Sequence, residues 1–506
     1  MRKSDTSSEA ATIEGPVQSA ASPTTGSRSR HGARSADARD ASVTPAAYAR
    51  SMKGAVAAGH PLTAEAGADV LRGGGNAVDA CIAAAAVSWV CESPLTGLGG
   101  GGFLLVHLAG DAHPHLLDFF VAVPQGAGAA EELVELVVDF GGTQQIFFTG
   151  PASVAVPGTG AGLWEAHGRW GSLPWPELLA PAAGVARDGV VLDEPRAYLH
   201  EILDALLRHS PEGDALYGPG RALDVGERFA IPELADTLDR LALEGPDCIY
   251  RGELAERIAA HVPVTLDDLA GYRVIEREPL EVSYRGGVLR TNPPPSSGGR
   301  LLAVGLEALG DAEPTALAVA RAMQAQEAEA AGGTTHISVV DGDGNAAALS
   351  CSLGSSSGIV VPGTGIHLNN MLGESHLTGG EHPGERLTSL MAPSLYEQAG
   401  RPRLVLGSAG SRRLHGAIFQ VVANVAGRGL GVEEAVEAPR MHAAEGIVHC
   451  EDPAAGDELE AAGLPVVRWG ERNLFFGGVS AVEIREDGSL AAAGDPRRGG
   501  ASVVVA

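Results

Sequence analysis

The chain has 506 residues, 44% of them hydrophobic, so it is long enough to bury a large core. Its formal net charge is −27 at pH 7, and Lys3 and Lys53 are its only lysines. An acidic surface repels nucleic acids and anionic membranes, so we expect neither as a partner.

The N-terminal segment, residues 1–49, is rich in Ser, Ala and Arg and predicts a disordered low-complexity tail. No apolar run of seven or more residues follows its basic start, so no signal peptide is visible and we expect a cytoplasmic protein. The five cysteines are scattered and odd in number, which indicates buried thiols in a reducing compartment. The histidines contain no H-E-x-x-H pair, and we expect no metal and no other cofactor.

Several segments before residue 330 have the periodicity of helices or strands. Apolar residues at helical spacing predict the helices, and short runs rich in β-branched or aromatic residues predict the strands. The segment after residue 76 is almost wholly apolar, which indicates a fully buried helix. The expected helices are 60–71, 77–90, 164–175, 176–188 and 232–243, and the expected strands are 103–107 and 286–292.

The segment from Thr334 to Ser352 predicts a β-hairpin. Residues 334–340 are rich in β-branched side chains, Asp343-Gly344 is a strong turn signal, and residues 346–352 can return as the second strand. A turn centred there pairs Thr334 with Ser352, so two hydroxyls meet on one face. Thr334 is a candidate nucleophile if a cut just before it frees its α-amine as a base. The alternative is a plain solvent-facing hairpin.

Two Gly- and Ser-rich segments follow the hairpin. Residues 407–411 precede a predicted helix, 412–425, whose first N–H groups and positive dipole end suit an anion, although a capped tight turn explains them equally well. Gly354 to Gly358 matches the G-x-S-x-G elbow of serine hydrolases, but a strand signal rather than a helix follows it, so we reject that interpretation. Further strands are expected at 403–406 and 479–484.

Seven separated blocks carry a resemblance that runs from about Gly54 to the C-terminus. Together they resemble the γ-glutamyltranspeptidase family, in the family's order. The blocks are Ala64-Glu65-Ala66-Gly67 with 73–80, 96–103, Val156-Pro157-Gly158, 293–299, the Thr334 hairpin, 362–370 and Asp495-Pro496-Arg497. The resemblance implies an α+β protein with the N-terminal-nucleophile hydrolase fold, a four-layer αββα sandwich. It also implies one precursor that cuts itself between Gly333 and Thr334.

The resemblance assigns the candidate catalytic residues one by one. Thr334 matches the nucleophile, and Ser352 matches the second-strand Thr that hydrogen-bonds it. Gly410 and Ser411 stand where the family places a Gly-Gly pair whose backbone amides form the oxyanion hole. The cut implied by the resemblance divides the chain into a large chain, 50–333, and a small chain, 334–506, which stay associated.

The substrate pocket departs from the family pattern. The family binds the glutamyl α-carboxylate with an Arg after Asp-Phe, where this chain has Phe120. Met371 and Glu374 replace the Gln and Asp that hold the α-amine, Gly354 replaces a loop Asn, and Leu390 replaces one Ser of a pair. Arg386, Arg412 or Arg413 are candidates to replace the lost charge. The expected substrate-binding residues are Phe120, Asn370, Met371, Glu374 and Ser389.

The resemblance, with Thr334 and Ser352 retained, implies a self-processing amide hydrolase or acyltransferase that cleaves γ-glutamyl or related amides of a small molecule or peptide through an acyl-enzyme. Phe120, Met371 and Leu390 favour a more apolar acyl group, as in related cephalosporin-type acylases. A different hypothesis is an unprocessed relative that binds a small ligand without chemistry, because a fold need not keep its function.

Overall fold

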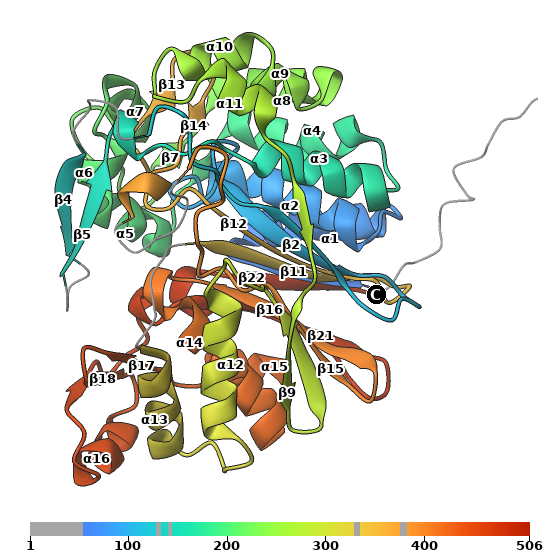
Figure 1. The fold of residues 1–506 in the computed structure, drawn as a ribbon, viewed down its shortest axis with the longest axis vertical. Helices are drawn as coiled ribbons and strands as arrows, with labels where there is room; N and C mark the ends of the chain where they lie inside the picture. The colour runs from blue at the N-terminus through green and yellow to red at the C-terminus, as the bar shows by residue number, and fades with distance from the viewer. Residues whose placement is uncertain (1–53, 128–132, 140–143, 328–333, 375–381) are drawn as a thin grey trace, which may run out of the picture. The chain divides into compact units, whose positions relative to one another are not determined.

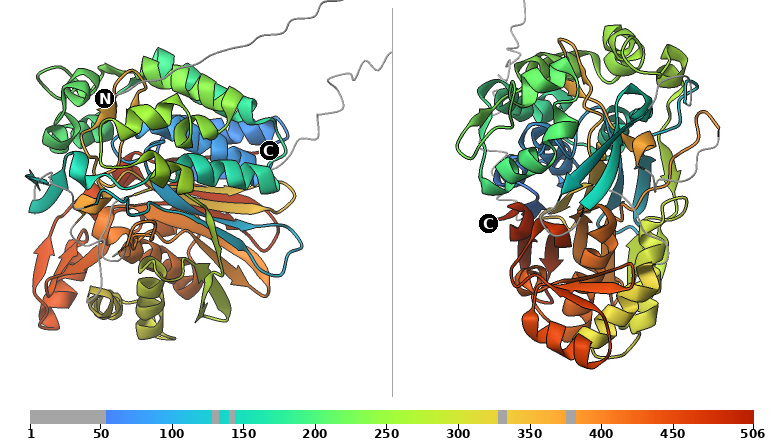
Figure 2. Two further views of the ribbon diagram at one scale, coloured as in Figure 1. Left: turned by 45° about the horizontal axis from the view of Figure 1, so that its top comes forward. Right: turned by 90° about the vertical axis from the view of Figure 1, so that its left-hand side faces the viewer.

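The computed structural model describes residues 54–127, 133–139, 144–327, 334–374 and 382–506. These residues form two stacked β-sheets between two layers of helices, which is the predicted four-layer αββα arrangement (Figure 1). Figure 2 shows the same layers from two other sides. The predicted tail and Gly333 lie outside the described residues.

The first sheet has seven strands and contains the predicted hairpin at its centre. Strand β1 pairs antiparallel with β11 on one side and with β22 on the other, so residues from both ends of the chain share this sheet. In spatial order the strands are β22 (Ala501–Val505), β1 (Gly54–Ala58), β11 (Thr335–Val340), β12 (Ala346–Ser352), β2 (Gly101–His107), β3 (His115–Phe119) and β8 (Ile275–Arg277).

The second sheet has six strands and packs face to face on the first. Small side chains such as Ala57, Ala348 and Ala492 are buried in a common cluster between the sheets, which lets the two backbones approach closely. In spatial order the strands are β21 (Leu490–Gly494), β20 (Gly478–Ile484), β16 (Arg401–Ala409), β15 (Ser394–Gln398), β10 (Gly287–Thr291) and β9 (Leu280–Tyr284).

One helical layer covers the outer face of the seven-stranded sheet. Helix α2 is buried along its whole length, as predicted, and begins with a capping box formed by Asn76 and Asp79. The predicted helix 164–175 is wrong in its bounds, because the chain turns extended at Gly171 and a new helix begins at Trp175. The layer comprises α1 (Pro61–Arg72), α2 (Ala77–Cys91), α3 (Thr159–Trp170), α4 (Trp175–Asp188) and α8 (Pro232–Glu244).

A second helical layer covers the six-stranded sheet. The predicted helix 412–425 is divided here: a 3-10 turn, η4 (Ser411–Arg413), leads into α14 (Leu414–Val422), and a π-helical segment, η5 (Ala423–Gly427), ends it. The other helices of this side are α12 (Gly298–Leu309), α13 (Ala316–Glu327), α15 (Val432–Glu437) and α16 (Pro453–Ala461).

Smaller elements surround these layers. Among the described residues, no helix is long and apolar enough to span a bilayer, and all five cysteines are buried without disulfides. The remaining strands are β4 (Val134–Asp139), β5 (Gln144–Thr149), β6 (Val190–Val191), β7 (Arg228–Phe229), β13 (Val360–Val361), β14 (Ile366–His367), β17 (Met441–Ala444), β18 (Ile447–Cys450) and β19 (Val466–Arg468). The remaining helices are α5 (Glu194–Ile202), α6 (Asp204–Leu207), α7 (Pro211–Tyr217), α9 (Asp247–Tyr250), α10 (Glu253–Ala259), α11 (Leu266–Gly271), η2 (Pro151–Ser153), η3 (Met371–Gly373), η6 (Leu474–Phe476) and η7 (Pro496–Arg498).

Candidate active site

The β11–β12 hairpin has the predicted register. Thr335 pairs with Cys351, and Val340 pairs with Ala346. The same register places Thr334, the residue just before β11, opposite Ser352. Both side chains are buried, and the Ser352 hydroxyl accepts a hydrogen bond of 2.8 Å from the Gly354 N–H. Two hydroxyl-bearing residues therefore meet at the end of the hairpin, in the interior of the protein.

A buried carboxyl group fixes the first residue of β11. The Thr335 hydroxyl donates to Glu92 at 2.5 Å, and the Thr63 hydroxyl donates to the other carboxylate oxygen at 3.0 Å. Burial raises the pKa of Glu92, while these hydrogen bonds and the charges of Arg196 and Arg498 lower it. The carboxyl thus anchors the strand one residue away from Thr334.

His336 bridges the two sheets. Its ring nitrogens lie 2.8 Å from the Ser350 hydroxyl and 3.0 Å from the Ser338 hydroxyl. A Cβ added at Gly407 of the opposite sheet would come within 2.3 Å of the imidazole, so glycine is required there. Burial lowers the pKa of His336 to about 3. The ring is therefore a neutral packing group, and both its nitrogens lie within hydrogen-bond distance of serine hydroxyls.

Thr334 lines a cavity of about 40 Å³, which is room for a few water molecules. The predicted oxyanion residues Gly410 and Ser411 line the same cavity. The other lining residues are Gly354 and Ser355, the apolar residues Leu95, Phe147, Leu199, Leu203 and Leu474, and the arginines Arg413 and Arg498.

A sharp turn brings Gly410 and Ser411 to this cavity. Gly410 follows the last residue of β16, and Ser411 is the first residue of η4, which leads into α14. Gly410 has φ 137° and Ser411 has φ 55°, both in the region that favours glycine. A Cβ added at Gly410 would lie 2.6 Å from the Gly477 Cα, so only glycine fits at that position. The backbone conformation of Gly410 and Ser411 is thus restricted, which suits a site built from main-chain N–H groups.

Glu374 and Asn370 support the wall of the cavity from behind. The Ser355 hydroxyl donates to Glu374 at 3.1 Å, and the Ser355 N–H donates to Asn370 Oδ1 at 2.8 Å. Gly354 has φ 74°, and a Cβ there would lie 2.1 Å from Asn370 Oδ1 and 3.3 Å from Glu374 Oε1. Burial raises the pKa of Glu374 to about 7, against smaller opposing effects of its hydrogen bonds and of Arg412.

Comparison with known proteins decides which family this is. The family model described as Gamma-glutamyltranspeptidase matches residues 63–324 and 310–505. The chain belongs to the gamma-glutamyltranspeptidase family. It is accordingly an enzyme of the hydrolase or transferase type with the N-terminal-nucleophile hydrolase fold, and self-processing is part of this family's chemistry.

Relatives in the gamma-glutamyltranspeptidase family have more than one named activity. The chain is 32% identical over 556 residues to the glutathione hydrolase proenzyme of Pseudomonas aeruginosa, covering 92% of this chain and 97% of that protein. It is 30% identical over 535 residues to the acylase ACY 1 proenzyme of a Pseudomonas species, covering 90% and 94%. The crystal structure of cephalosporin acylase from Bacillus halodurans matches with a TM-score of 0.78 at 26% identity, covering 89% and 95%.

Three substrate-binding residues expected from the family pattern lie in the packed interior and not among the residues that line the Thr334 cavity. Phe120 stacks on Phe103 with ring centroids 5.6 Å apart. Met371 is buried in the same hydrophobic cluster as these two rings. The Ser389 hydroxyl accepts a hydrogen bond of 3.0 Å from the Met391 N–H, two residues along the chain. Their role in substrate binding stays a prediction.

Arg386 does not face the Thr334 cavity either. Its Nε lies 3.4 Å from Asp118 Oδ1, and its guanidinium lies over the Tyr272 ring at 4.5 Å. Asp118 also accepts 2.7 Å from Arg277 and 2.9 Å from the Phe120 N–H. The Asp-Phe segment of the family pattern is therefore a packed ion pair and backbone turn in this chain.

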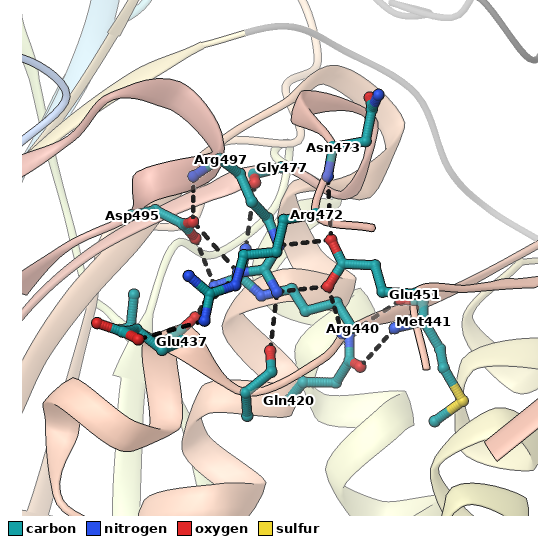
Figure 3. Close-up of polar contacts among 12 residues, drawn as sticks. Gln420, Glu437, Arg440, Met441, Glu451, Arg472, Asn473, Gly477, Asp495 and Arg497 are labelled. Carbon is teal, nitrogen blue, oxygen red and sulfur yellow. Dashed lines mark hydrogen bonds and ion pairs between the residues drawn. The ribbon is translucent and has the colours of Figure 1, made fainter. Parts of the chain in front are cut away.

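A buried ion cluster holds both ends of the segment from Asn473 to Gly477 (Figure 3), and Leu474 belongs to this segment. Arg497 lies 2.5 Å from Glu451 and 3.2 Å from Asp495, and Arg440 lies 2.5 Å from Asp495. Arg440 also donates to the Gly477 carbonyl at 3.1 Å. The Asp495-Pro496-Arg497 block of the sequence thus fixes the loop that borders the Thr334 cavity, a role that its spacing did not reveal.

Sequence reasoning missed Glu92, Leu474 and Arg498 as parts of the site. Arg498 directly follows the Asp495-Pro496-Arg497 block, and Glu92 lies four residues before the Gly-rich block that begins at Thr96. Closeness to these blocks in the chain was a signal, but only the fold brings Arg498 to the Thr334 cavity and Glu92 to Thr335. Among the described residues, no group of three or more His, Cys, Asp or Glu is placed to hold a metal ion.

Proposed function

We propose that the chain cuts itself between Gly333 and Thr334 and that Thr334 is then the nucleophile of an amide hydrolase and acyltransferase. The observation that carries this proposal is the position of Thr334, opposite Ser352 by register and in one cavity with Gly410 and Ser411. The large chain, 50–333, and the small chain, 334–506, stay associated because β1 of the first pairs with β11 and β22 of the second.

The cut gives Thr334 the base that its hydroxyl needs. The freed α-amine takes the hydroxyl proton while Oγ1 attacks the carbonyl carbon of a substrate amide. Backbone N–H groups of Gly410 and Ser411 hold the oxyanion of the tetrahedral intermediate. The amine then returns the proton to the leaving nitrogen as the C–N bond breaks, which leaves an ester on Thr334. Water or an acceptor amine attacks that ester and restores the free hydroxyl.

The environment of the hairpin supports the α-amine as the base. His336 is the nearest imidazole in sequence, but its two nitrogens face Ser350 and Ser338 rather than Thr334. The Glu92 carboxylate accepts a hydrogen bond from the hydroxyl of Thr335, the residue next to Thr334. Both groups are thus engaged with other residues, which supports the amine produced by the cut as the base.

Two substrate classes are supported by different residues in and around the cavity. Glu374 lies behind Ser355 and would attract an ammonium group, which supports a γ-glutamyl amide as the acyl donor. The apolar wall supports an acyl group with more hydrocarbon, as in an acylase. That wall consists of Leu95, Phe147, Leu199, Leu203 and Leu474.

Intact mass of the purified protein tests the proposal. Wild type should give two chains, the second beginning at Thr334, whereas Thr334→Ala should stay one uncut chain after the same incubation. Thr334→Ser is the matched control, because it keeps a hydroxyl and should still be cut. A wild type that stays uncut and releases no acyl group from γ-glutamyl p-nitroanilide would contradict the proposal and favour a non-catalytic ligand-binding protein.

A further inference from the structure

Four buried polar side chains form one continuous series of hydrogen bonds behind the wall of the Thr334 cavity. The Ser93 hydroxyl lies 2.6 Å from the Tyr217 hydroxyl, which in turn lies 2.7 Å from His367 Nδ1. The second ring nitrogen of His367, Nε2, bonds the Ser356 hydroxyl. Each of the four residues has an exposed fraction of 4% or less. We call Ser93, Tyr217, His367 and Ser356 the buried relay.

One end of the relay holds a strained turn of the cavity wall. Gly354 and Ser355 line the Thr334 cavity, and Ser356 follows them with φ 88°, a conformation that L side chains rarely adopt. The Ser356 hydroxyl accepts a hydrogen bond of 2.8 Å from the Gly358 N–H, in addition to its bond with the relay histidine. Both bonds compensate the strain. If the Ser356 backbone relaxed, its neighbour Ser355 would move relative to Thr334.

The other end of the relay fixes the imidazole from behind. Tyr217 is the last residue of α7, and its ring packs edge-on against His200 with ring centroids 5.5 Å apart. Ser93 follows the end of α2 and lies two residues before Leu95, which lines the same cavity. The position of the His367 ring is therefore set by contacts with α7 and with the segment after α2, and not only by the turn that the ring holds.

The relay consists of neutral groups. Burial lowers the pKa of His367 to about 3 and raises the pKa of Tyr217 above its ordinary value. A neutral imidazole donates a hydrogen bond from one nitrogen and accepts one at the other, so His367 can bond both hydroxyls at once. Interrupting such a series is costly, because the group that loses its partner stays buried. The relay therefore keeps its geometry over the ordinary range of pH.

Ser356 and His367 resemble the serine–histidine pair of a hydrolase only in part. Ser356 is the middle residue of the G-x-S-x-G match from Gly354 to Gly358, and its hydroxyl has the histidine partner that a nucleophile needs. Its exposed fraction is 0%, however, and it is not among the described residues that line the Thr334 cavity. A substrate carbonyl cannot reach a hydroxyl that is sealed in this way. The pair is therefore a positioning contact.

We infer that the buried relay sets the length of the acyl group that the Thr334 cavity accepts, by holding the turn of residues 354–358 in place. The cavity has a volume of about 40 Å³, so even a small outward shift of one wall enlarges it by a large fraction. With the relay intact, the wall of Gly354 and Ser355 stops a longer acyl chain. The four relay residues are positioning residues, because they act through this wall. The inference rests on the proposed function, since an acyl group bound at Thr334 reports the position of the wall.

Two pairs of p-nitroanilide donors measure the limit on acyl length. The γ-L-glutamyl and δ-L-aminoadipyl donors differ by one methylene in the acyl chain, and so do the butyryl and pentanoyl donors. In the wild type, kcat/KM should favour the shorter member of any pair that is turned over by about tenfold or more, as one methylene does in a closed pocket. The ratio of kcat/KM for the longer donor to that for the shorter donor is followed, because the amount of active enzyme cancels in it.

Two replacements of His367 separate the two bonds of its ring. Gln places an amide near the position of Nε2 and can keep the bond to Ser356, whereas Asn places one near Nδ1 and can keep only the bond to Tyr217. Each variant loses one buried hydrogen bond, so both should lose stability alike. His367→Asn should raise the longer-to-shorter ratio by about tenfold, and His367→Gln by less than about twofold. Ser356→Ala should behave like His367→Asn.

Tyr217→Phe and Tyr396→Phe form a matched pair of variants. Tyr396 is also buried, and its hydroxyl donates 2.9 Å to the Tyr284 carbonyl in the second sheet. Both variants lose one buried tyrosine hydrogen bond, so thermal unfolding should show similar losses of stability. Only Tyr217→Phe should raise the donor ratio, by about threefold, because only it frees the His367 ring. Self-cutting, checked by mass, shows that each variant has folded, and Tyr217→Phe provides the test if His367→Asn stays uncut.

Three results would overturn the inference. A wild type that cuts itself and turns over both members of a pair equally well would show that the cavity sets no limit on acyl length. Donor ratios that are the same in His367→Asn and His367→Gln, or in Tyr217→Phe and Tyr396→Phe, would show that the relay only stabilises the fold. Both results leave the proposed function intact. An uncut wild type that turns over none of the four donors would remove the proposed function and the inference together.

Discussion

Replacing Glu374 with Gln should change how the stability of the protein depends on pH. Glu374 is buried, and its carboxyl accepts a hydrogen bond of 3.1 Å from the Ser355 hydroxyl. Gln has nearly the same shape and an oxygen that can accept the same bond, but it carries no titratable proton. The variant therefore isolates the free energy associated with ionising this one buried group.

The magnitude follows from the pKa of the carboxyl. Burial raises the pKa of Glu374 from the ordinary 4.5 to about 7. Between pH 4.5 and about pH 7 the folded protein keeps a proton on Glu374 that the unfolded chain releases. The free energy of unfolding therefore falls as pH rises through this range. At about 1.4 kcal/mol per pH unit, the window of about 2.5 units lowers wild-type stability by about 3 kcal/mol.

Urea unfolding at two pH values measures this effect. Both proteins should carry Thr334→Ala, so that a single uncut chain unfolds in each case. Relative to its parent, Glu374→Gln should gain about 3 kcal/mol between about pH 4 and about pH 8. A difference between the two proteins that is the same at both pH values would refute the reasoning, because it would mean that Glu374 ionises in the folded protein near its ordinary pKa.

Two further predictions concern groups that position the site. Thr335→Val removes the hydroxyl that donates to Glu92 and should slow self-cleavage by about tenfold. A time course of the two chains on a denaturing gel measures this rate. An unchanged half-time of cleavage would contradict the anchoring role of Glu92. Asp495→Asn leaves Arg440 and Arg497 with one buried counter-charge fewer and should destabilise the protein by about 3–5 kcal/mol. Calorimetry should show this as a lower midpoint temperature of unfolding. A midpoint temperature equal to that of wild type would count against a structural role for the ion cluster.

The hairpin was predictable because its information is local. Asp343-Gly344 sets the turn, and the turn alone sets the register that pairs Thr335 with Cys351. Helix α2 was predictable for a similar reason, since an apolar segment of its length must be buried on all sides. The boundary of α3 was not, because the helical periodicity continues through Gly171, where the backbone becomes extended.

The cavity walls could not be predicted because they come from distant segments. Leu199, Leu474 and Arg498 are brought to the Thr334 cavity by the fold, and no spacing in the chain links them to Thr334. Phe120 is expected to bind substrate from its place in the family pattern, and this stays a prediction. Its packing could not be predicted from the sequence: Asp118 accepts a hydrogen bond from the Phe120 N–H, and the Phe120 ring stacks on Phe103.

Trapping the acyl-enzyme is the most direct test of the central claim that Thr334 is the nucleophile. Turnover of γ-L-glutamyl or glutaryl p-nitroanilide would be stopped with acid within the first cycle, and the small chain would be digested and mapped by mass. We predict the added acyl mass on the peptide that begins with Thr334, and none in Thr334→Ala. An acyl group on any other residue, or p-nitroaniline release without an acylated Thr334, would contradict the account.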